Sequence, residues 1–553
     1  MLVTFSYYAD IKFSYVGYFD TPEVAANSGS EINVSLSSLF PNTNIWARGN
    51  FDPGNSVAYP GELGDIFLNI RSDANWLPSY AAGSAGWFVF MHELGHTLGL
   101  KHPHDDGGTG RPTFAEVGYD LNTDWASIMS YADDYNWNTK QWDPATPMIL
   151  DVLALQYIYG KNMDTNAGDS TFSLSQTNTY LTIWDSSGND NVSAAGSTVD
   201  WQIELPNIRV STLVDTKVGI AFPKAEISLP SPKSLYWLSG DIENASGGSG
   251  NDTITGNDAN NIIRGGAGVD ILDGGSGFDT AMFAGKSSGY YLIENATSPL
   301  IVVPRTTNTR LRDGTDILDN IEQVLFDGDG VSKPASATTN KAFGLSYIAS
   351  NPDLIKFFGT NVDAGVEHYI QSGINEGRTV TFDGLRYIAS NPDLIKFFGT
   401  DADAGAAHYI QSGINEGRTT TFDGLRYIAS NPDLIKFFGT DADAGAAHFV
   451  QSGVNEGRTT TFDGLRYIAS NPDLIQFFGT DADAGAAHYI QFGINEGRTT
   501  TFDGLRYIAA NTDLIRFFGT DANAGVKHYI QSGINEGRTS TFDANFYLAK
   551  IVT

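Results

Sequence analysis

Cysteine is absent from the 553 residues of this chain, so disulfides and thiolate metal sites are both excluded. Basic residues are scarce, since 33 Lys and Arg face 64 Asp and Glu and the formal net charge is −31. Such a charge repels nucleic acid and anionic membranes, and it suits a chain that binds cations. No apolar run approaches the ~18 residues of a membrane-spanning helix. We therefore expect no nucleic-acid partner, no membrane span, and stabilisation by ions such as calcium.

We expect no Sec signal peptide at the N-terminus of this sequence. The first residues, Met-Leu-Val-Thr-Phe-Ser, lack the basic region and the apolar core of a Sec signal. Glycine is abundant by contrast, with 60 residues against a usual share of ~7%. The length predicts three or four domains.

One cluster of histidines has the spacing of a metal site. His92 and His96 are four residues apart, so on a helix they share one face and can bind one ion. Gly99 permits a sharp turn that returns His102 as a third nitrogen ligand. Three protein ligands leave a position for water, which is the arrangement of a catalytic zinc site. Glu93, beside the first ligand, can act on that water as a general base.

The alternative is a helix with unrelated surface histidines, but the full pattern H-E-x-x-H-x-x-G-x-x-H is rare. Downstream, Ser127–Tyr131 reads Ser-Ile-Met-Ser-Tyr, which resembles the Met-turn of the metzincins. On these two motifs the chain resembles the serralysins, secreted bacterial zinc metalloproteases. The resemblance implies that Met129 packs beneath the zinc and that the Tyr131 hydroxyl reaches the metal or the oxyanion. His104 is interpreted as a loop residue and not as a ligand.

The resemblance also implies an α+β metzincin catalytic domain over residues 1–160. Ala9–Tyr15 alternates weakly and resembles a central strand of the family's catalytic sheet, so we expect a strand there. In the family, another strand and a long helix precede that strand, so we expect a domain that is short at its N-terminal side. We expect an edge strand at Ser56–Pro60, whose Ala58 and Tyr59 would pair with an extended peptide substrate. Further elements are expected as a strand at Gly64–Asn69 and a closing helix within Thr146–Gly160.

Residues 161–330 are expected to form a β-rich, calcium-binding RTX domain. Trp184–Asp190 resembles the first calcium loop of the family, and Asn166–Ser170 resembles its partner loop. The alternative for either loop is an ordinary Asp/Gly turn. The ligands that the resemblance implies are Asn166, Gly168, Ser170, Asp185, Ser187 and Asp190.

Four nine-residue repeats follow between residues 247 and 282. Each starts with a glycine turn, and apolar residues recur at the eighth position, in phase, as a flexible glycine-rich linker would not keep them. Stacked turns that share calcium through carbonyls and carboxylates predict a parallel β-roll. The second repeat has Asn257 and Asn261 in place of Gly and Asp, so a site there is expected to be weak or absent. The candidate ligands are Gly248, Gly250, Asp252, Gly265, Ala267, Gly268, Asp270, Gly274, Ser276, Gly277 and Asp279.

The C-terminal part repeats with a period of 40 residues. After a linker at residues 331–341, five helical repeats span residues 342–541, and residues 542–553 are a partial repeat and a possible secretion tail. Asn391-Pro392 predicts the cap and start of one helix, and a second is expected around Ala404–Gln411. Such units bury their apolar faces against their neighbours, as in a solenoid. The histidine that recurs once per unit is interpreted as a packing residue and not as a metal ladder.

Two hypotheses remain. The first is a calcium-stabilised, extracellular zinc endopeptidase, exported by a type I secretion apparatus, monomeric, and acting on proteins and peptides. The second is a surface or binding protein that acts through its repeat array on protein or carbohydrate, with an inactive or truncated peptidase. The intact histidines, Glu93 and Met-turn favour the first.

Overall fold

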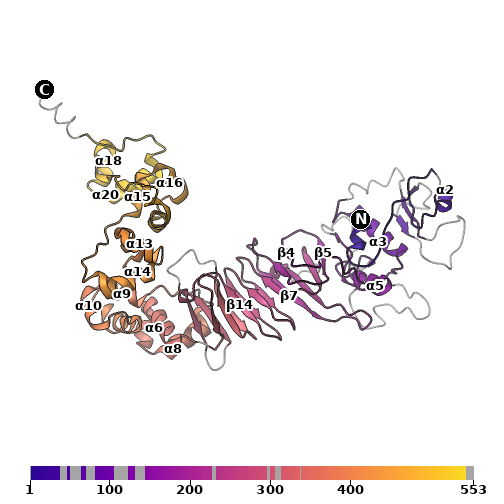
Figure 1. Ribbon diagram of the computed structural model, residues 1–553, viewed down its shortest axis with the longest axis horizontal. Coiled ribbons are helices and arrows are strands. Elements are labelled where there is room, and N and C mark those ends of the chain that lie inside the picture. Colours follow the sequence, from indigo (N-terminus) through magenta and orange to yellow (C-terminus); the bar gives the residue numbers. More distant parts are fainter. Residues whose placement is uncertain are drawn as a thin grey trace. The chain divides into compact units, whose positions relative to one another are not determined.

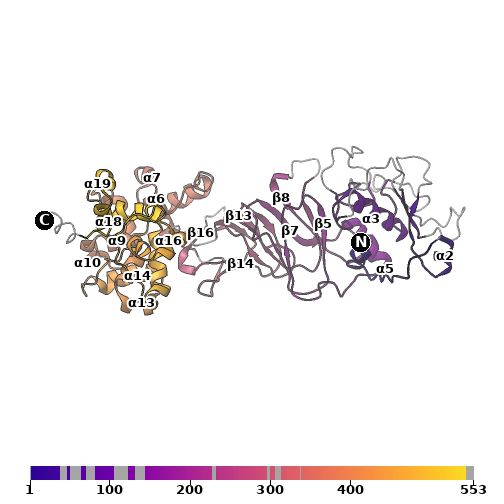
Figure 2. The ribbon, with the colours of Figure 1, turned by 90° about the horizontal axis from the view of Figure 1, so that it is seen from above.

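The computed structural model describes residues 2–20, 22–37, 47–49, 64–69, 81–104, 122–130, 143–226, 232–294, 299–305, 313–336 and 338–543. They fall into two compact units, Met1–Thr339 and Asn340–Thr553 (Figures 1 and 2). Among the described residues, no helix is long and apolar enough to cross a membrane.

The N-terminal part of the first unit combines short helices with a small sheet. The sheet has the order β1-β3-β2, with β1 parallel and β2 antiparallel to β3. The elements are α1 (Leu2–Ser6), α2 (Pro22–Asn27), β1 (Val34–Ser37), β2 (Ala47–Gly49), β3 (Ile66–Asn69), α3 (Ala85–Thr97) and α5 (Ile149–Tyr159). The strand predicted at Gly64–Asn69 and the helix predicted within Thr146–Gly160 are confirmed as β3 and α5.

The prediction of a strand at Ala9–Tyr15 was wrong. Ala9 forms only an isolated bridge with Lys161, and the segment after it has no strand. Ile11 and Phe13 pack against the core but are only partly buried, and Tyr15 is 88% exposed. The segment therefore contacts the core without pairing along a neighbouring strand. The expected edge strand at Ser56–Pro60 lies outside the described residues.

Two larger sheets form the rest of the first unit. Successive repeat strands alternate between the sheets and pair in parallel with the strand two places along the chain. One sheet contains β19 (Val331–Pro334), β18 (Gln323–Phe326), β14 (Thr280–Phe283), β12 (Ile262–Arg264), β10 (Asn244–Ser246), β6 (Asn191–Ser193) and β4 (Thr171–Ser173), in that order. The other contains β15 (Tyr290–Ile293), β16 (Leu300–Pro304), β17 (Thr315–Asp319), β13 (Val269–Asp273), β11 (Thr253–Thr255), β7 (Trp201–Ile208), β8 (Val218–Pro223), β9 (Leu235–Gly240) and β5 (Tyr180–Asp185).

The apolar residues at the eighth position of the repeats lie between the two sheets. Ile254, Ile263, Leu272 and Ala281 are all fully buried, as the sequence predicts. The region also shares a core with the histidine helix, because Tyr180 and Leu235 pack in the same cluster as residues of α3. Residues 331–334 of the expected linker form β19, which pairs antiparallel with β18.

The second unit repeats three short helices and a π-helical turn five times. The first helices are α6 (Asn340–Ser350), α9 (Gly384–Ser390), α12 (Gly424–Ser430), α15 (Gly464–Ser470) and α18 (Gly504–Ala510). The second helices are α7 (Pro352–Phe358), α10 (Pro392–Phe398), α13 (Pro432–Phe438), α16 (Pro472–Phe478) and α19 (Thr512–Phe518). The third helices are α8 (Val362–His368), α11 (Ala402–His408), α14 (Ala442–His448), α17 (Ala482–His488) and α20 (Ala522–His528).

The first helix of each repeat was missing from the sequence prediction. In α9, Asp383 caps the helix by accepting the N–H of Arg386 at 2.8 Å. Asn391 was predicted as the cap of α10, but its side chain makes no cap hydrogen bond. Instead its amide donates to the carbonyls of Tyr387 and Thr419 at 2.7 and 2.8 Å, which ties α9 to the end of the same repeat.

Neighbouring repeats are joined through their first and third helices, since α6 packs against α11, α9 against α14, α12 against α17, and α15 against α20. The recurring histidine serves this packing inside each repeat. The hydroxyl of the buried Tyr387 lies 2.8 Å from Nδ1 of His408, whose ring also stands against Phe398. This arrangement agrees with the prediction of a packing histidine.

Candidate metal centre

The helix α3 carries the first two histidines. Its N-terminus is capped by Ser84, whose hydroxyl accepts the N–H of Trp87. Its inner face packs into the core through Phe88, Met91 and Leu94. The helix ends where Gly99 adopts a φ of 93°, a conformation that glycine reaches without strain. This turn brings residues 100–102 back beside the helix.

The turn places three imidazoles around one point. Nε2 of His102 lies 3.1 Å from Nε2 of His92 and 3.0 Å from Nε2 of His96. Among the described residues, these three form the only group of three or more potential ligands with atoms within 4.8 Å of one another. Three nitrogens bound at ~2.0–2.1 Å to one tetrahedral zinc ion lie roughly 3.3 Å apart. The spacing therefore fits a metal of that size.

The Nδ1 atoms of His92 and His96 indicate the tautomer of each ring. Nδ1 of His92 lies 2.8 Å from the carbonyl of Ile128, and Nδ1 of His96 lies 2.9 Å from the carbonyl of Leu100. Because a carbonyl only accepts, both Nδ1 atoms carry the hydrogen and both Nε2 atoms present lone pairs. Burial, and then the charge of His96, lower the pKa of His92 well below its usual value. Because the Nε2 lone pairs of His92 and His96 both face Nε2 of His102, a cation between the three rings fits the donor set.

A buried carboxylate on α5 holds the turn that orients His92. Asp151 accepts the hydroxyl of Ser127 and the N–H groups of Ile128 and Met148, at 2.7, 2.7 and 2.9 Å. Burial raises the pKa of Asp151 to about 6. Sequence reasoning missed this residue, although a single acid inside the apolar run Met148–Leu155 was a usable signal.

Met129 lies directly beneath the histidine helix. Its side chain is 1% exposed, and a Cβ added at Gly95 would lie 2.6 Å from its sulfur. The glycine between the two helical histidines thus lets the Met129 side chain reach the helix surface. The role of Met129 as a packing floor beneath a zinc ion, which the resemblance implies, stays a prediction.

The structure places Glu93 but not the other predicted catalytic and substrate residues. Glu93 is buried, with 7% of its surface exposed, on the helix that carries His92 and His96. His104 is exposed and its ring stacks on His102, with 4.9 Å between centroids, outside the group of three. Tyr131, Ala58 and Tyr59 lie outside the described residues.

The predicted calcium loops meet at the start of the two-sheet region. Asp190 accepts the N–H of Ser170 at 2.6 Å, and Asn166 donates to the carbonyl of Trp184 at 2.7 Å. Asp185 is fully buried, and neither of its carboxylate oxygens has a hydrogen-bond partner among the described residues. Burial, and then the charge of Asp190, raise the pKa of Asp185 to about 8. A buried carboxylate without a donor, next to a second buried carboxylate with one oxygen that also lacks a donor, fits a bound cation.

A second pair of carboxylates lies between the repeat turns and β17. Asp270 and Asp316 are register partners on β13 and β17, and both are fully buried. Oδ2 of Asp270 and both oxygens of Asp316 lack hydrogen-bond partners in the described structure. Burial raises the pKa of Asp270 to about 7 and, followed by the charge of Asp270, raises that of Asp316 well above its usual range. Sequence reasoning missed Asp316, although Gly314-Thr-Asp316 repeats positions four to six of the nonapeptide pattern.

The other predicted calcium residues occupy the stacked turns. The N–H of Ala267 donates to the carbonyl of Gly248 at 3.0 Å, and the N–H of Ser276 donates to that of Asn257 at 3.1 Å. Oδ2 of Asp279 also lacks a partner among the described residues. The remaining candidates lie in the same two stacks of turns or in the first loop: Gly168, Ser187, Gly250, Asp252, Gly265, Gly268, Gly274 and Gly277.

The second repeat differs, because the amide side chains of Asn257 and Asn261 stand where the repeat pattern has Gly and Asp. Asn261 accepts the N–H of Asn257 at 2.9 Å and donates to the carbonyl of Glu243 and the side chain of Asn257. Asn257 in turn donates to the carbonyls of Pro206 and Ile242. The amides thus donate to three backbone carbonyls. A weak or absent calcium site at this repeat stays a prediction.

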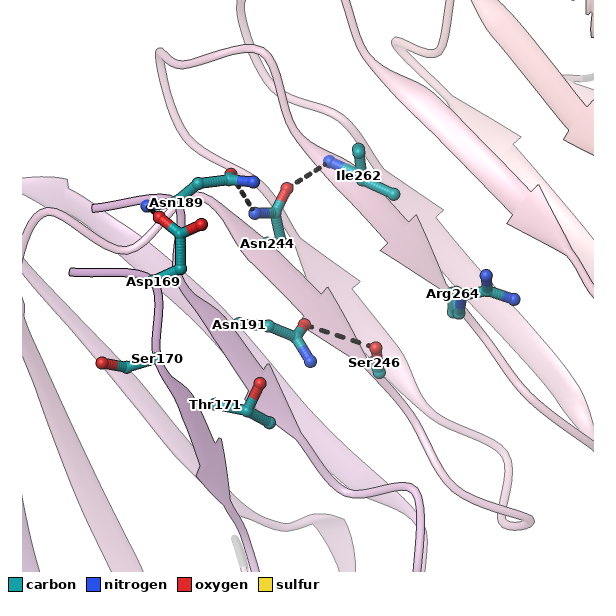
Figure 3. A pocket seen from close by; sticks show the side chains of 9 residues that line it. All are labelled: Asp169, Ser170, Thr171, Asn189, Asn191, Asn244, Ser246, Ile262 and Arg264. Carbon is teal, nitrogen blue, oxygen red and sulfur yellow. Dashed lines mark hydrogen bonds between the residues drawn. The ribbon is translucent and has the colours of Figure 1, made fainter.

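Further asparagine side chains lie on β6 and β10 of the same sheet (Figure 3). Asn244 donates to Asn189 at 2.8 Å and accepts the N–H of Ile262 at 2.8 Å, which links β10 to β12 and to the loop before β6. These residues border a shallow polar groove of about 280 Å³ that also includes Asp169 and Arg264.

Two comparisons with known proteins bear on this geometry. Residues 246–281 match the family described as the RTX calcium-binding nonapeptide repeat, with four copies. The chain is 35% identical to metallopeptidase AprA of Pseudomonas marginalis over 224 residues, which cover 37% of this chain and 43% of that protein. The chain is related to the serralysins.

Further serralysins show the same relationship. Serralysin G of Dickeya chrysanthemi is 34% identical over 244 residues, 39% of this chain and 46% of its own length. Serralysin of Proteus mirabilis is 30% identical over 267 residues, 45% of this chain and 50% of its own. The chain thus spans half or less of the length of these serralysins. Zinc and calcium are the cofactors that follow from a serralysin-type peptidase with RTX repeats.

Proposed function

We propose that the chain is a zinc-dependent endopeptidase that hydrolyses peptide bonds in proteins and is stabilised by calcium. The convergence of the Nε2 atoms of His92, His96 and His102 on one point carries the proposal. The fixed Nδ1–H groups of two of these rings and the relationship to metalloproteases support it.

In this proposal the three histidines hold the zinc ion, which when bound supplies a Lewis acid for water and for the substrate carbonyl. Glu93 is the general base: it takes a proton from the attacking water and passes it to the departing amine nitrogen. The Tyr131 hydroxyl stabilises the negative charge that develops on the carbonyl oxygen. No covalent bond forms between protein and substrate, because water is the nucleophile.

The other residues position substrate and site. Met129 supports the ligand helix from below, and Asp151 keeps the carbonyl of Ile128 in place for His92. In this proposal, the backbone at Ala58 and Tyr59 pairs with the extended substrate. In domain terms, residues 1–160 are a metzincin-type catalytic domain and residues 161–330 are a parallel β-roll.

Calcium binds at the buried carboxylates in this proposal. Asp185 and Asp190 hold one ion with Asn166, Gly168, Ser170 and Ser187, and Asp252, Asp270 and Asp279 hold others with the carbonyls of the glycine turns. Because the ionised carboxylates repel one another without the ion, calcium stabilises the folded region, which suits a calcium-rich exterior. We further propose that the protein is extracellular, that it reaches the exterior through a type I secretion apparatus, and that it acts as a monomer.

The test is cleavage of denatured casein by the calcium-loaded, full-length chain, with and without 1,10-phenanthroline. The proposal predicts cleavage that the chelator abolishes and that added zinc restores. A folded chain that contains one zinc ion but leaves casein intact would refute it.

A further inference from the structure

Each of the five C-terminal repeats exposes one phenylalanine at the same position. These residues lie in the last turn of the second helix, and between 71% and 77% of each is exposed. They are Phe357, Phe397, Phe437, Phe477 and Phe517. The next residue along the chain, represented by Phe398, instead packs against His408. The exposed ring is thus a separate feature from the apolar core.

The second helix takes little part in joining the repeats. Successive repeats pack through their first and third helices, whereas α10 packs mainly against α9 and α11 of its own repeat. The inner face of α10 is closed by Leu394, which is 4% exposed. In Figure 2, α10, α13 and α19 lie at the outer edge of the second unit. The packing of one repeat on the next therefore leaves the exposed rings uncovered.

Polar groups surround each ring. Asp393 lies one turn before Phe397 on α10, and Lys396 adjoins it; both are exposed. Nη1 of Arg418 donates to both oxygens of Asp393, at 3.0 and 2.8 Å. The same Arg–Asp pair recurs in all five repeats. Within the described second helices, the ring is the only large apolar side chain that is exposed, except in the last repeat, where Ile515 is exposed too, and it lies one helical turn from an Arg–Asp pair. It is therefore unlike the continuous apolar patch that a lipid or protein interface uses.

The charge of the array selects among ligands. The repeat at residues 382–421 contains five acidic residues (Asp383, Asp393, Asp401, Asp403 and Glu416) against three basic ones (Arg386, Lys396 and Arg418), a net charge of −2. Such a surface repels nucleic acid, acidic polysaccharides and anionic membranes. The residue before the ring varies as Lys436, Gln476 and Arg516, whereas the ring is present in every repeat. A fixed positive charge is therefore not part of the shared site.

We propose that the five phenylalanines bind a neutral polysaccharide, with one ring in each repeat as a separate contact site. The C–H face of a sugar packs on the ring, and its hydroxyls bond to the carboxylate and guanidinium of the neighbouring Asp–Arg pair. A polymer offers the same group many times and can engage several repeats at once, so that weak single contacts add to useful avidity. The array would thereby hold the chain on a carbohydrate matrix.

The test is co-sedimentation of the full-length chain with insoluble cellulose, chitin and β-1,3-glucan. A variant with all five phenylalanines replaced by serine is compared with the wild type. A matched control replaces five exposed glutamines outside the second helices, Gln371, Gln411, Gln451, Gln491 and Gln531, by serine. We expect binding to at least one polymer, a loss of at least about tenfold in the phenylalanine variant, and no loss in the control.

Circular dichroism establishes that both variants keep their helices, and Phe397→Ser and Phe437→Ser alone are used if the fivefold variant unfolds, with a graded loss expected. The proposal is overturned if none of the three polymers binds, or if the phenylalanine variant binds as well as the wild type. It is also overturned if only alginate or anionic vesicles bind. Self-association of the wild type that the phenylalanine variant loses, without polymer binding, would assign the rings to a second copy of the chain.

Discussion

Asp151 and Ile128 are joined by a hydrogen bond that connects α5 to the metal centre. Oδ2 of Asp151 accepts the N–H of Ile128 at 2.7 Å, and the carbonyl of Ile128 receives Nδ1–H of His92 at 2.8 Å. The carboxylate of Asp151 therefore positions Ile128, and Ile128 in turn fixes the orientation of the His92 imidazole. Interactions of this kind keep metal ligands in the geometry that the ion requires.

Replacing Asp151 by Asn should weaken metal binding. An amide has one accepting oxygen where Asp151 uses two, and its NH₂ group would face an N–H or a hydroxyl that also donates. We expect a loss of zinc affinity of about 10- to 100-fold, measured by competition with a chromophoric chelator. Asp164→Asn, at an exposed position, is the control. Equal affinity in both variants would show that Asp151 does not support the centre.

Gly95→Ala should destabilise the protein although alanine favours helices. The added Cβ would lie 2.6 Å from the sulfur of the buried Met129, so the thioether must move in a packed environment. We expect a loss of about 1–3 kcal/mol, against the gain of about 1 kcal/mol that this change gives in an exposed helix. Urea unfolding measures it. Met129→Ala should reduce the cost of Gly95→Ala in a double-mutant cycle, and purely additive effects would contradict the contact.

Without calcium, the first unit should be more stable in mild acid than in base. The pKa of Asp185 is raised to about 8 and that of Asp270 to about 7, above the usual 3.8. A raised folded-state pKa adds stability at low pH that is lost as the pH rises through the folded value. With EGTA, we therefore expect the unfolding free energy of this unit to fall between pH 6 and pH 9.

Calcium should reverse this dependence, because protons compete with the ion for the same carboxylates. Thermal unfolding at several pH values, with EGTA or with calcium, tests both statements. Asp185→Asn should flatten the part of the EGTA profile near pH 8. An EGTA profile that rises with pH over the same range would contradict the assignment of protonated, buried carboxylates.

Asn261→Asp should destabilise the calcium-free protein. The change removes the amide that donates to the carbonyl of Glu243 and to Asn257, and a lost partner for a buried group costs about 1–3 kcal/mol. Asn251→Asp is the matched control, because Asn251 accepts the N–H of Val269 and aspartate can do the same. Chemical unfolding in EGTA compares the two, and an equal effect of both changes would contradict the structural role of the amide.

Local patterns made the histidine helix, its terminating glycine and the nonapeptide repeats predictable from the sequence. The sequence spacing of His92, His96 and His102 predicts that their side chains come together on a helix and the turn after it. The nine-residue period predicts that Ile254 and its equivalents lie in the core between the two sheets. Asp151 and Asp316 could not be assigned in the same way, because their partners lie far away in the sequence. The short first helix of each repeat escaped notice, since it depends on packing against the next repeat.

The most direct test of the central claim is a comparison of Glu93→Gln with the wild type. Glu93 is proposed as the base and not as a ligand, so the variant should bind one zinc ion as the wild type does and keep its fold. Casein cleavage should fall by at least about a hundredfold, as expected when a general base is removed. A zinc-loaded Glu93→Gln variant that cleaves casein at the wild-type rate would contradict the account.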